Sequence, residues 1–364
     1  MNNMLAALDK KVQESMLNNF GKENYDEYRF GKYTPPQIGL LRRIKNLLVR
    51  PKQAKFDVAK HSLITKYGDR LSSFYDNVDD NSKQLIIDLI AYRILGYTKV
   101  KLPLSNKTYW KLFEKVKPLL NENDTINPQF LHFLLKRGKL NSIGYNIDFY
   151  FTEAGIVTDF ILEQYAYKHK NEYVVVAEKG DVVLDIGGCW GDTALYFADK
   201  VSDTGKVYSF EFIPGNIELH NMNTSLNPHL KKQIALIENP VSDISNQEIY
   251  YRDNGPASRL SLTPFDGQTG LTQTISIDDF VAKNNIEKID FIKMDIEGAE
   301  PMALRGAINT IKTFKPKLAI AIYHSMDDFV NIPEWILSLG LGYKLHVGHY
   351  KIHAEETILF AIQS

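Results

Sequence analysis

Val182-Val-Leu-Asp-Ile-Gly-Gly-Cys-Trp-Gly-Asp-Thr193 is the stretch that decides the fold of this sequence. Its first five residues are apolar apart from Asp185, which is typical of a buried strand, and the apolar residues that follow Thr193 recur at helical spacing. The turn between the strand and the helix carries the glycines Gly187, Gly188 and Gly191. Because glycine permits a sharp turn and a close approach by a ligand, this order predicts a ligand-binding junction of an α/β sheet.

The glycine spacing and the neighbouring acids indicate which nucleoside would bind there. Cys189 stands where a dinucleotide-binding fingerprint has its second glycine, and the Asp185 carboxylate would repel a pyrophosphate. The same carboxylate would attract the ammonium and sulfonium groups of S-adenosylmethionine. The next strand, 206–212, contains a second acid, Glu211, which is placed to accept hydrogen bonds from ribose hydroxyls. The two acids therefore favour S-adenosylmethionine, and the alternative is that both only cap loops.

Four segments resemble, in order and spacing, the motif series of the FkbM family of S-adenosylmethionine-dependent methyltransferases. They are Asp185-Ile-Gly-Gly-Cys-Trp-Gly-Asp-Thr193, Phe210-Glu-Phe-Ile-Pro214, Thr274-Ile-Ser-Ile-Asp-Asp-Phe280 and Asp290-Phe-Ile-Lys-Met-Asp-Ile-Glu-Gly-Ala-Glu300. The resemblance covers residues 145–362 and is most specific in the last segment. It implies a Rossmann-like class I methyltransferase fold. Cofactor contacts are expected at Asp185, Gly187, Gly188, Gly191, Thr193, Glu211, Phe212 and Ser242. On the adenine side Asn239, Val241 and Asp243 are alternatives to Ser242, and the sequence does not choose among them.

Composition excludes several classes of protein. The chain has 364 residues and a net charge of -1, so it lacks the basic excess of a nucleic-acid-binding protein. Its one cysteine, Cys189, excludes an intramolecular disulfide and any site with several cysteine ligands. The first ten residues lack the apolar core of a secretion signal, so a cytoplasmic location is expected.

The sequence divides into two parts. Residues 1–140 have helical apolar spacing in several segments and predict an α-helical region, whereas 141–364 predict the methyltransferase domain. The helical segments are 4–20, 36–49, 83–95 and 109–120. Residues 36–55 combine an apolar face with a basic one. This is compatible with peripheral contact with a membrane or a lipid-linked acceptor, or with a surface helix docked on its own core.

The second part alternates between strands and helices. Segment 156–165 predicts a helix that covers the adenosine side, and 248–252 predicts a strand whose following loop either contacts substrate or is an ordinary hairpin. The strands expected after Glu211 are 234–243, 289–294, 317–323, 343–347 and 357–362. With the two strands around the glycine turn they predict a seven-stranded, mostly parallel sheet whose last strand is antiparallel.

Two groups could manage the proton that leaves the acceptor during methyl transfer. Asp295 ends the fourth strand, and Glu297 and Glu300 follow it closely, although both glutamates fit equally well as first-turn residues of a helix. His324 ends the fifth strand and titrates in the range of a useful base. Tyr323 is expected on the opposite face of the sheet. The histidines with weaker claims are His220, His346, His349 and His353.

The predicted function is S-adenosylmethionine-dependent O-methyl transfer. The acceptor class, a hydroxyl of a sugar, glycan intermediate or glycosylated natural product, comes only from the family resemblance. In related catechol-type methyltransferases the end of the fourth strand contributes to a Mg²⁺ site, so Mg²⁺ is compatible with the sequence, but spacing alone predicts no set of ligands. Two alternatives remain: a nicotinamide-dependent dehydrogenase, which the glycine spacing disfavours, and a nucleoside-binding scaffold without catalysis.

Overall fold

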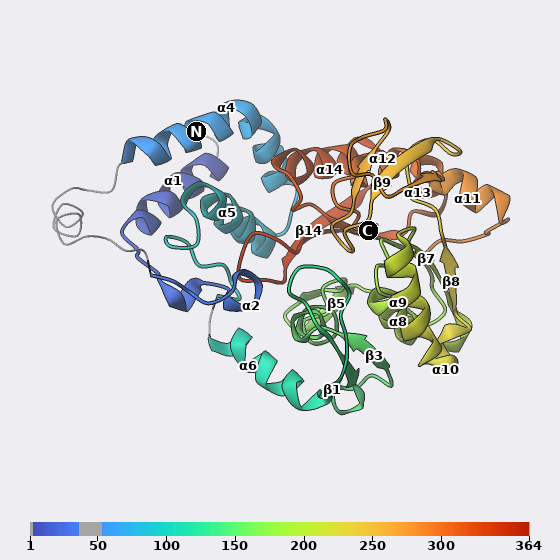
Figure 1. Ribbon diagram of the computed structural model, residues 1–364. Helices are drawn as coiled ribbons and strands as arrows, with labels where there is room; N and C mark the ends of the chain where they lie inside the picture. The colour runs from blue at the N-terminus through green and yellow to red at the C-terminus, as the bar shows by residue number, and fades with distance from the viewer. Residues whose placement is uncertain (1–2, 36–52, 106, 364) are drawn as a thin grey trace. The chain divides into compact units, whose positions relative to one another are not determined.

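The computed structural model describes residues 3–35, 53–105 and 107–363 (Figure 1). The chain forms two compact units. The first comprises residues 1–110 and 345–357, and the second comprises 111–344 and 358–364. The predicted boundary at residue 140 lies inside the second unit. Most of the predicted basic helix, residues 36–52, lies outside the described residues, so its contact with a membrane or a lipid-linked acceptor stays a prediction.

The first unit is built from helices. Its main helices are α1 (Asn3–Met16), α2 (Glu27–Phe30), α4 (Gln53–Asp76) and α5 (Asp80–Leu95). Helix α5 begins three residues before the predicted segment 83–95, because Asp79 caps it by accepting hydrogen bonds from the backbone N–H groups of Asn81 and Ser82. Helix α1 also lies where predicted, and α4 was not predicted. The buried side chains of Met4, Leu8 and Leu71 show that α1 and α4 contribute to the core of this unit.

The second unit begins with secondary structure outside its main sheet. Helix α6 (Lys107–Val116) crosses the boundary between the two units and lies where a helix was predicted. Two small antiparallel sheets follow: β1 (Leu120–Ile126), β2 (Leu135–Lys139) and β3 (Asp148–Phe151), then β4 (Tyr167–His169) and β5 (Glu172–Val175). Between them the π-helix η4 (Ile156–Ile161) replaces most of the α-helix predicted over 156–165.

The main sheet has seven strands in the order β14-β15-β13-β12-β6-β7-β8. Their bounds are β6 (Val182–Ile186), β7 (Lys206–Phe210), β8 (Ile234–Ile237), β12 (Phe291–Met294), β13 (Lys317–Ala321), β14 (Tyr343–His349) and β15 (Thr357–Gln363). Neighbouring strands from β8 to β13 are parallel, and β15 runs antiparallel to β13. The predicted sheet with a reversed last strand is therefore confirmed. The third strand ends earlier than predicted, at Ile237, and residues 241 and 275 form an isolated bridge instead.

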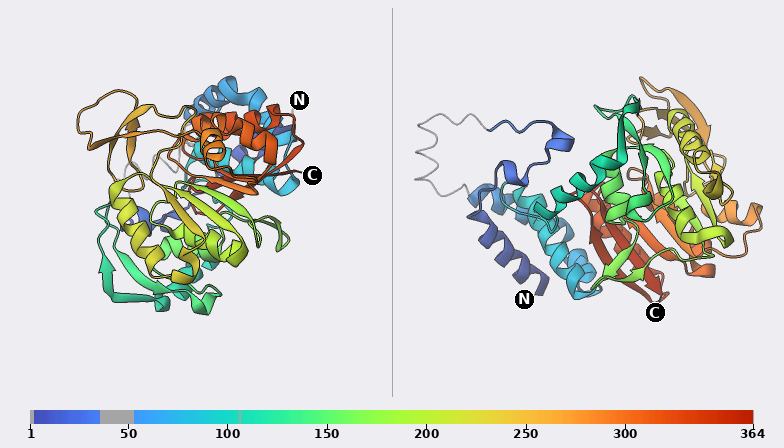
Figure 2. Two further views of the ribbon diagram at one scale, coloured as in Figure 1. Left: turned by 90° about the vertical axis from the view of Figure 1, so that its right-hand side faces the viewer. Right: turned by 90° about the horizontal axis from the view of Figure 1, so that it is seen from below.

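Helices cover both faces of this sheet within the second unit (Figures 1 and 2). One face is covered by α8 (Asp192–Val201), α9 (Pro214–Ser225) and α10 (Pro228–Lys231), and the other by α11 (Ile277–Lys283), α12 (Glu300–Arg305), α13 (Ile308–Phe314) and α14 (Met326–Ser338). The strand predicted at 248–252 is β9 (Glu248–Arg252), which pairs with β10 (Arg259–Ser261) and β11 (Gly270–Gln273). The carboxyl ends of β6, β7, β12 and β13 meet at one edge, where ligands of such sheets bind.

Candidate active site

The glycine turn after β6 is shaped by the packing of the protein itself. Gly187 and Gly191 have left-handed φ values of 90° and 83°, which side chains other than glycine rarely adopt. A Cβ atom at Gly187 would lie 2.1 Å from the carbonyl oxygen of Asp295, and one at Gly188 would lie 2.0 Å from Ser209 Oγ. These glycines are therefore required for the turn to pack against β7 and the end of β12, a reason that the sequence did not reveal.

Asp185 lies at the end of β6 as predicted, but its carboxylate points into the protein. The residue is 0% exposed, and its carboxylate oxygens accept hydrogen bonds from the hydroxyls of Thr193 (2.9 and 3.0 Å) and Ser209 (2.9 Å). Its Oδ1 atom also lies 3.1 Å from Lys293 Nζ. The hydrogen bonds between Asp185 and Thr193 thus join the two ends of the glycine turn. The direct contact predicted between Asp185 and the cofactor's cation stays a prediction.

Lys293 is a buried cation that the sequence reasoning missed. Its side chain is 1% exposed, and Nζ donates to the carbonyl oxygen of Gly187 at 2.6 Å in addition to its ion pair with Asp185. Burial lowers the pKa of Lys293, but the Asp185 and Asp295 carboxylates outweigh burial and hold the pKa above its usual value. A lysine inside the apolar run Phe291–Met294 was the signal that could have identified it.

Glu211 immediately follows β7, and its carboxylate accepts hydrogen bonds from neighbouring groups of the protein. Its Oε1 accepts the backbone N–H groups of Phe212 (2.6 Å) and Ile213 (2.8 Å), and its Oε2 accepts from Asn216 Nδ2 at 3.1 Å. Burial raises the pKa of Glu211, which these donors oppose. The carboxylate therefore fixes the start of α9, and its predicted contact with ribose stays a prediction.

Phe212 and Ser242 are the other predicted cofactor contacts on this side. The Phe212 ring packs edge-on against Tyr251 of β9, with 5.6 Å between ring centroids. The backbone N–H of Ser242 donates to the carbonyl oxygen of Ile275 at 3.0 Å, next to the bridge that follows β8. Both residues lie beyond the carboxyl ends of their strands, where an adenosine would be expected, and their contact with a cofactor stays a prediction.

Asp192 retains a buried oxygen without a hydrogen-bond donor. The residue follows the glycine turn directly and begins α8. It is 7% exposed, and no group among the described residues donates a hydrogen bond to its Oδ1. A buried acceptor without a donor is unfavourable, so this part of the turn suits a ligand that brings a donor. The ammonium group of S-adenosylmethionine is such a donor, and the turn therefore fits this cofactor.

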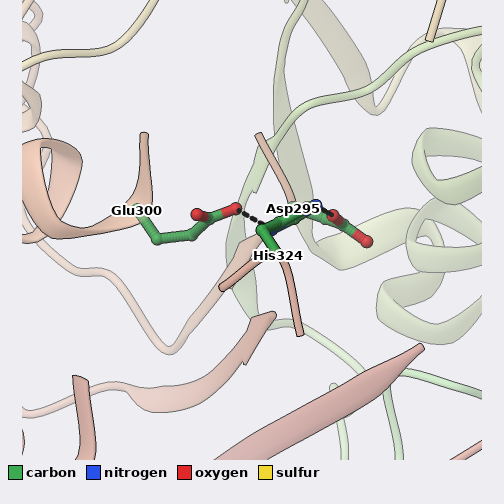
Figure 3. A group of neighbouring side chains, drawn as sticks. All are labelled: Asp295, Glu300 and His324. Carbon is green, nitrogen blue, oxygen red and sulfur yellow. Dashed lines mark ion pairs between the residues drawn. The ribbon is translucent and has the colours of Figure 1, made fainter. Parts of the chain in front are cut away.

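At the carboxyl ends of β12 and β13, one imidazole lies among carboxylates (Figure 3). His324 Nδ1 lies 3.3 Å from Glu300 Oε1, and His324 Nε2 lies 3.4 Å from Asp295 Oδ1 and 3.6 Å from Glu297 Oε2. Glu300 is 0% exposed, whereas the Glu297 side chain is 48% exposed. The structure thus brings the three predicted catalytic residues, Asp295, Glu297 and His324, together with Glu300, which the sequence placed in the same group of acids.

The acids around His324 determine its charge. Burial lowers the pKa of His324, but Glu300, Asp295 and Glu297 outweigh burial and raise the pKa to about 9. The imidazole is therefore protonated at neutral pH. Glu297 has a left-handed φ of 56°, a strained conformation that is often found in residues of functional sites.

Two tyrosine hydroxyls also bind Asp295. Tyr323 donates to Asp295 Oδ1 at 3.0 Å, and Tyr165 donates to Asp295 Oδ2 at 3.0 Å. The expectation that Tyr323 faces the opposite side of the sheet is wrong. Strand β13 ends at Ala321, so the alternation of faces along a strand no longer applies at Tyr323. Burial raises the pKa of Asp295, whereas His324 and Lys293 lower it, and burial dominates.

The residues at this strand end do not fit a Mg²⁺ ion. Asp295, Glu300 and His324 each offer one ligand atom within 4.8 Å of the others. However, Mg²⁺ requires near-octahedral oxygen ligands, and here one of the three ligand atoms is an imidazole nitrogen. Both oxygens of Asp295 already accept from tyrosine hydroxyls, and both ring nitrogens of His324 face carboxylates. These side chains therefore act through their own hydrogen bonds and charges.

The four histidines with weaker claims lie in other surroundings: one is in the second unit and three are in the first. His220 packs beneath the glycine turn, and a Cβ atom at Gly191 would lie 3.2 Å from it. Burial lowers the pKa of His220 to about 4, so this imidazole is neutral. His346, His349 and His353 belong to the first unit, where His346 Nδ1 lies 2.6 Å from Asp79 Oδ2.

The strand order, the glycine turn and the acidic strand ends are together those of a Rossmann-like class I methyltransferase fold. Residues 175–345 match the family model described as the Methyltransferase FkbM domain. This part of the chain therefore matches the FkbM methyltransferase domain, in agreement with the resemblance of the sequence motifs. No relative was found among curated proteins.

Two solved structures are similar to this chain at low sequence identity. Methyltransferase FkbM from Methylobacillus flagellatus KT is 19% identical, with a TM-score of 0.49, and the match covers 82% of this chain and 60% of that one. Fibrillarin from Aeropyrum pernix, crystallised with natively bound S-adenosyl-L-methionine, is 14% identical over 63% of this chain and 90% of its own, with a TM-score of 0.36. The chain thus spans about 60% of the length of the first of these structures. In the described residues no helix has the length and apolarity needed to cross a membrane.

Proposed function

We propose that the protein is an O-methyltransferase that uses S-adenosylmethionine to methylate a hydroxyl of a sugar, a glycan intermediate or a glycosylated natural product. One observation supports this most directly: the glycine turn and the His324 cluster share one edge of the sheet. A Cβ at Gly187 would touch the Asp295 carbonyl oxygen, and the Asp295 N–H donates to the carbonyl oxygen of Ile186 at 3.1 Å. A methyl donor held at the turn would therefore face Asp295 and His324.

The bound cofactor supplies an electrophilic methyl group on a positively charged sulfur. The chain's own residues must then orient the acceptor hydroxyl and accept its proton. We assign the base to His324, because its Nε2 is on the side of Asp295 and the half-exposed Glu297. The buried Glu300 carboxylate faces Nδ1 and fixes the orientation of the ring, as the third member of a catalytic triad does.

The charge of the cofactor acts on this base. A cation beside His324 disfavours protonated imidazole, so a bound sulfonium lowers the His324 pKa from its value of about 9. When bound, S-adenosylmethionine would supply the methyl group to the acceptor oxygen and would leave as S-adenosylhomocysteine, and His324 Nε2 would accept the hydroxyl proton. Asp295 and Glu297 stabilise the imidazolium that results.

The experiment measures transfer of the labelled methyl group from S-adenosylmethionine to a panel of free sugars, nucleotide sugars and glycosides. We expect an O-methylated product whose rate of formation rises from pH 7 toward pH 9, because the neutral fraction of His324 rises over this range. His324→Gln should lower the rate at least ~100-fold, which is the usual contribution of a general base, while S-adenosylhomocysteine affinity stays near that of the wild type. Cofactor binding without transfer to any hydroxyl would contradict the proposal and favour the scaffold alternative.

A further inference from the structure

The three acids around the glycine turn differ in how completely the protein satisfies them. The carboxylate oxygens of Asp185 accept from two hydroxyls, and those of Glu211 accept from two backbone N–H groups and one amide. Asp192 keeps a buried Oδ1 that accepts no hydrogen bond from the described residues. Of these three acids, only Asp192 has a buried carboxylate oxygen that accepts no hydrogen bond from the described residues.

A second carboxylate lies against Asp192. Asp159 belongs to η4, which precedes the segment that matches the family model, and its side chain interacts with that of Asp192. Burial raises the pKa of Asp192, the positive charge of Lys293 lowers it, and burial dominates. Two acids held together in a buried position are stabilised by a positive charge between or beside them.

The layout of the turn indicates which part of the cofactor supplies that charge. The transferred methyl group would have to face Asp295, so the sulfur would lie near Gly187, where a Cβ atom would lie 2.1 Å from the carbonyl oxygen of Asp295. The adenosine arm extends toward β7 and β8, as it does in folds of this kind. The amino-acid arm is left for the start of α8, where Asp192 follows Gly191. Its ammonium group carries three N–H donors and one positive charge.

We propose that Asp192 binds the ammonium group of the methionine part of S-adenosylmethionine, with Asp159 as the second carboxylate of the pair. The inference rests on the proposed function, because it concerns the cofactor of the same site. It also reassigns the cationic contact that the sequence predicted for Asp185. Asp185 instead holds the turn in place through Thr193, Ser209 and Lys293.

The test compares two ligands by calorimetry: S-adenosylhomocysteine and its deaminated analogue, in which a methylene group replaces the carbon that carries the ammonium. Asp192→Asn should weaken S-adenosylhomocysteine binding about 10- to 100-fold, the usual range for a charge-assisted hydrogen bond, and leave binding of the analogue unchanged. Asp159→Asn should lower affinity in the same selective way, by a smaller factor. Asp199→Asn, on the same helix α8, is the matched control and should change neither affinity.

Each outcome decides the inference. Equal weakening of both ligands by Asp192→Asn would mean that Asp192 only shapes the turn, and no weakening would mean that it lies away from the ligand. Either result overturns the inference and leaves the proposed function standing. If the variant does not fold, the wild type still decides, because it should bind S-adenosylhomocysteine at least ~10-fold more tightly than the analogue. Equal affinity of the wild type for both ligands overturns the inference, whereas failure of the wild type to bind either ligand overturns the proposed function itself.

Discussion

Two regions at one edge of the sheet balance their charges in different ways: the glycine turn, called the cofactor side because the cofactor is proposed to bind there, and the His324 cluster, called the methyl-transfer side because transfer is proposed there. Around the glycine turn, the buried acid Asp185 has a buried cation, Lys293, and two hydroxyl donors. Around His324, one imidazole faces three carboxylates, and neither of its ring nitrogens makes a hydrogen bond of good geometry within the described residues. The first arrangement rigidifies a turn. In the second, the negative charges of the carboxylates outnumber the single positive charge of the imidazole, an imbalance that is typical of sites where protons are transferred.

Removing the cation of the cofactor side should have the largest effect. Lys293→Met leaves the Asp185 carboxylate buried without its ion pair, so the free energy of unfolding should fall by about 3 to 5 kcal/mol. Urea denaturation followed by circular dichroism measures the change. The double variant Lys293→Met with Asp185→Asn serves as the control and should recover part of the loss, because it removes the unpaired charge. A single variant as stable as the wild type would break the comparison, since it would show that Lys293 does not compensate the buried charge of Asp185.

Titration of the methyl-transfer side should have the next largest effect. The folded-state pKa of His324 is raised to about 9 from an ordinary value of 6.5, so its stabilising contribution is complete below pH 6.5 and is lost as pH rises through about 9. The shift corresponds to roughly 3 kcal/mol of unfolding free energy. Denaturation of the wild type and His324→Gln between pH 6 and pH 10 should give curves that converge at the alkaline end. Parallel curves would show that the surrounding acids do not stabilise the imidazolium.

Glu211 should have a moderate effect on the cofactor side. Glu211→Ala leaves the N–H groups of Phe212 and Ile213 without their acceptor, so the free energy of unfolding should fall by about 1 to 3 kcal/mol. Thermal unfolding measures this loss. S-adenosylhomocysteine binding, measured on the same variant, sharpens the comparison because it separates support of α9 from a direct contact with ribose. Unchanged stability combined with weakened binding would assign Glu211 to the ligand alone.

A surface ion pair outside both regions should have the smallest effect. Arg305 Nη2 lies 2.9 Å from Asp243 Oδ2, but about half of the Arg305 side chain is exposed (51%). Exposed pairs of this kind contribute about 0 to 1 kcal/mol, so Arg305→Ala should change the free energy of unfolding by no more than that. Denaturation under the same conditions as for Lys293→Met gives the baseline. A loss as large as that of Lys293→Met would mean that burial does not distinguish the two pairs.

The sequence predicted the main sheet well because each strand can be recognised from a short run of neighbouring residues. Apolar runs bounded by glycine and acidic residues predicted the strands, and the short segment before the last strand predicted its reversal. Helix α4 was missed, although it is long. Its weak apolar face, in which Val58 is 69% exposed, gives little helical periodicity to detect.

The site was only partly predictable, since spacing fixes where a residue lies but not what its side chain faces. Asp295, Glu297 and His324 were predicted from the ends of strands and lie together as expected. Lys293 and Tyr165 were missed, because a buried lysine and a tyrosine from outside the central motifs become partners of the site only once the chain has folded. The orientation of Asp185 toward its own turn could not be read from the sequence for the same reason.

Calorimetric titration of the wild-type protein with S-adenosylhomocysteine tests the central claim most directly, because it requires no knowledge of the acceptor. If the glycine turn holds this cofactor as proposed, the protein should bind one molecule per chain with micromolar affinity. Absence of binding at millimolar concentrations of the ligand would contradict the assignment of the glycine turn to this cofactor, and the proposed methyl transfer with it.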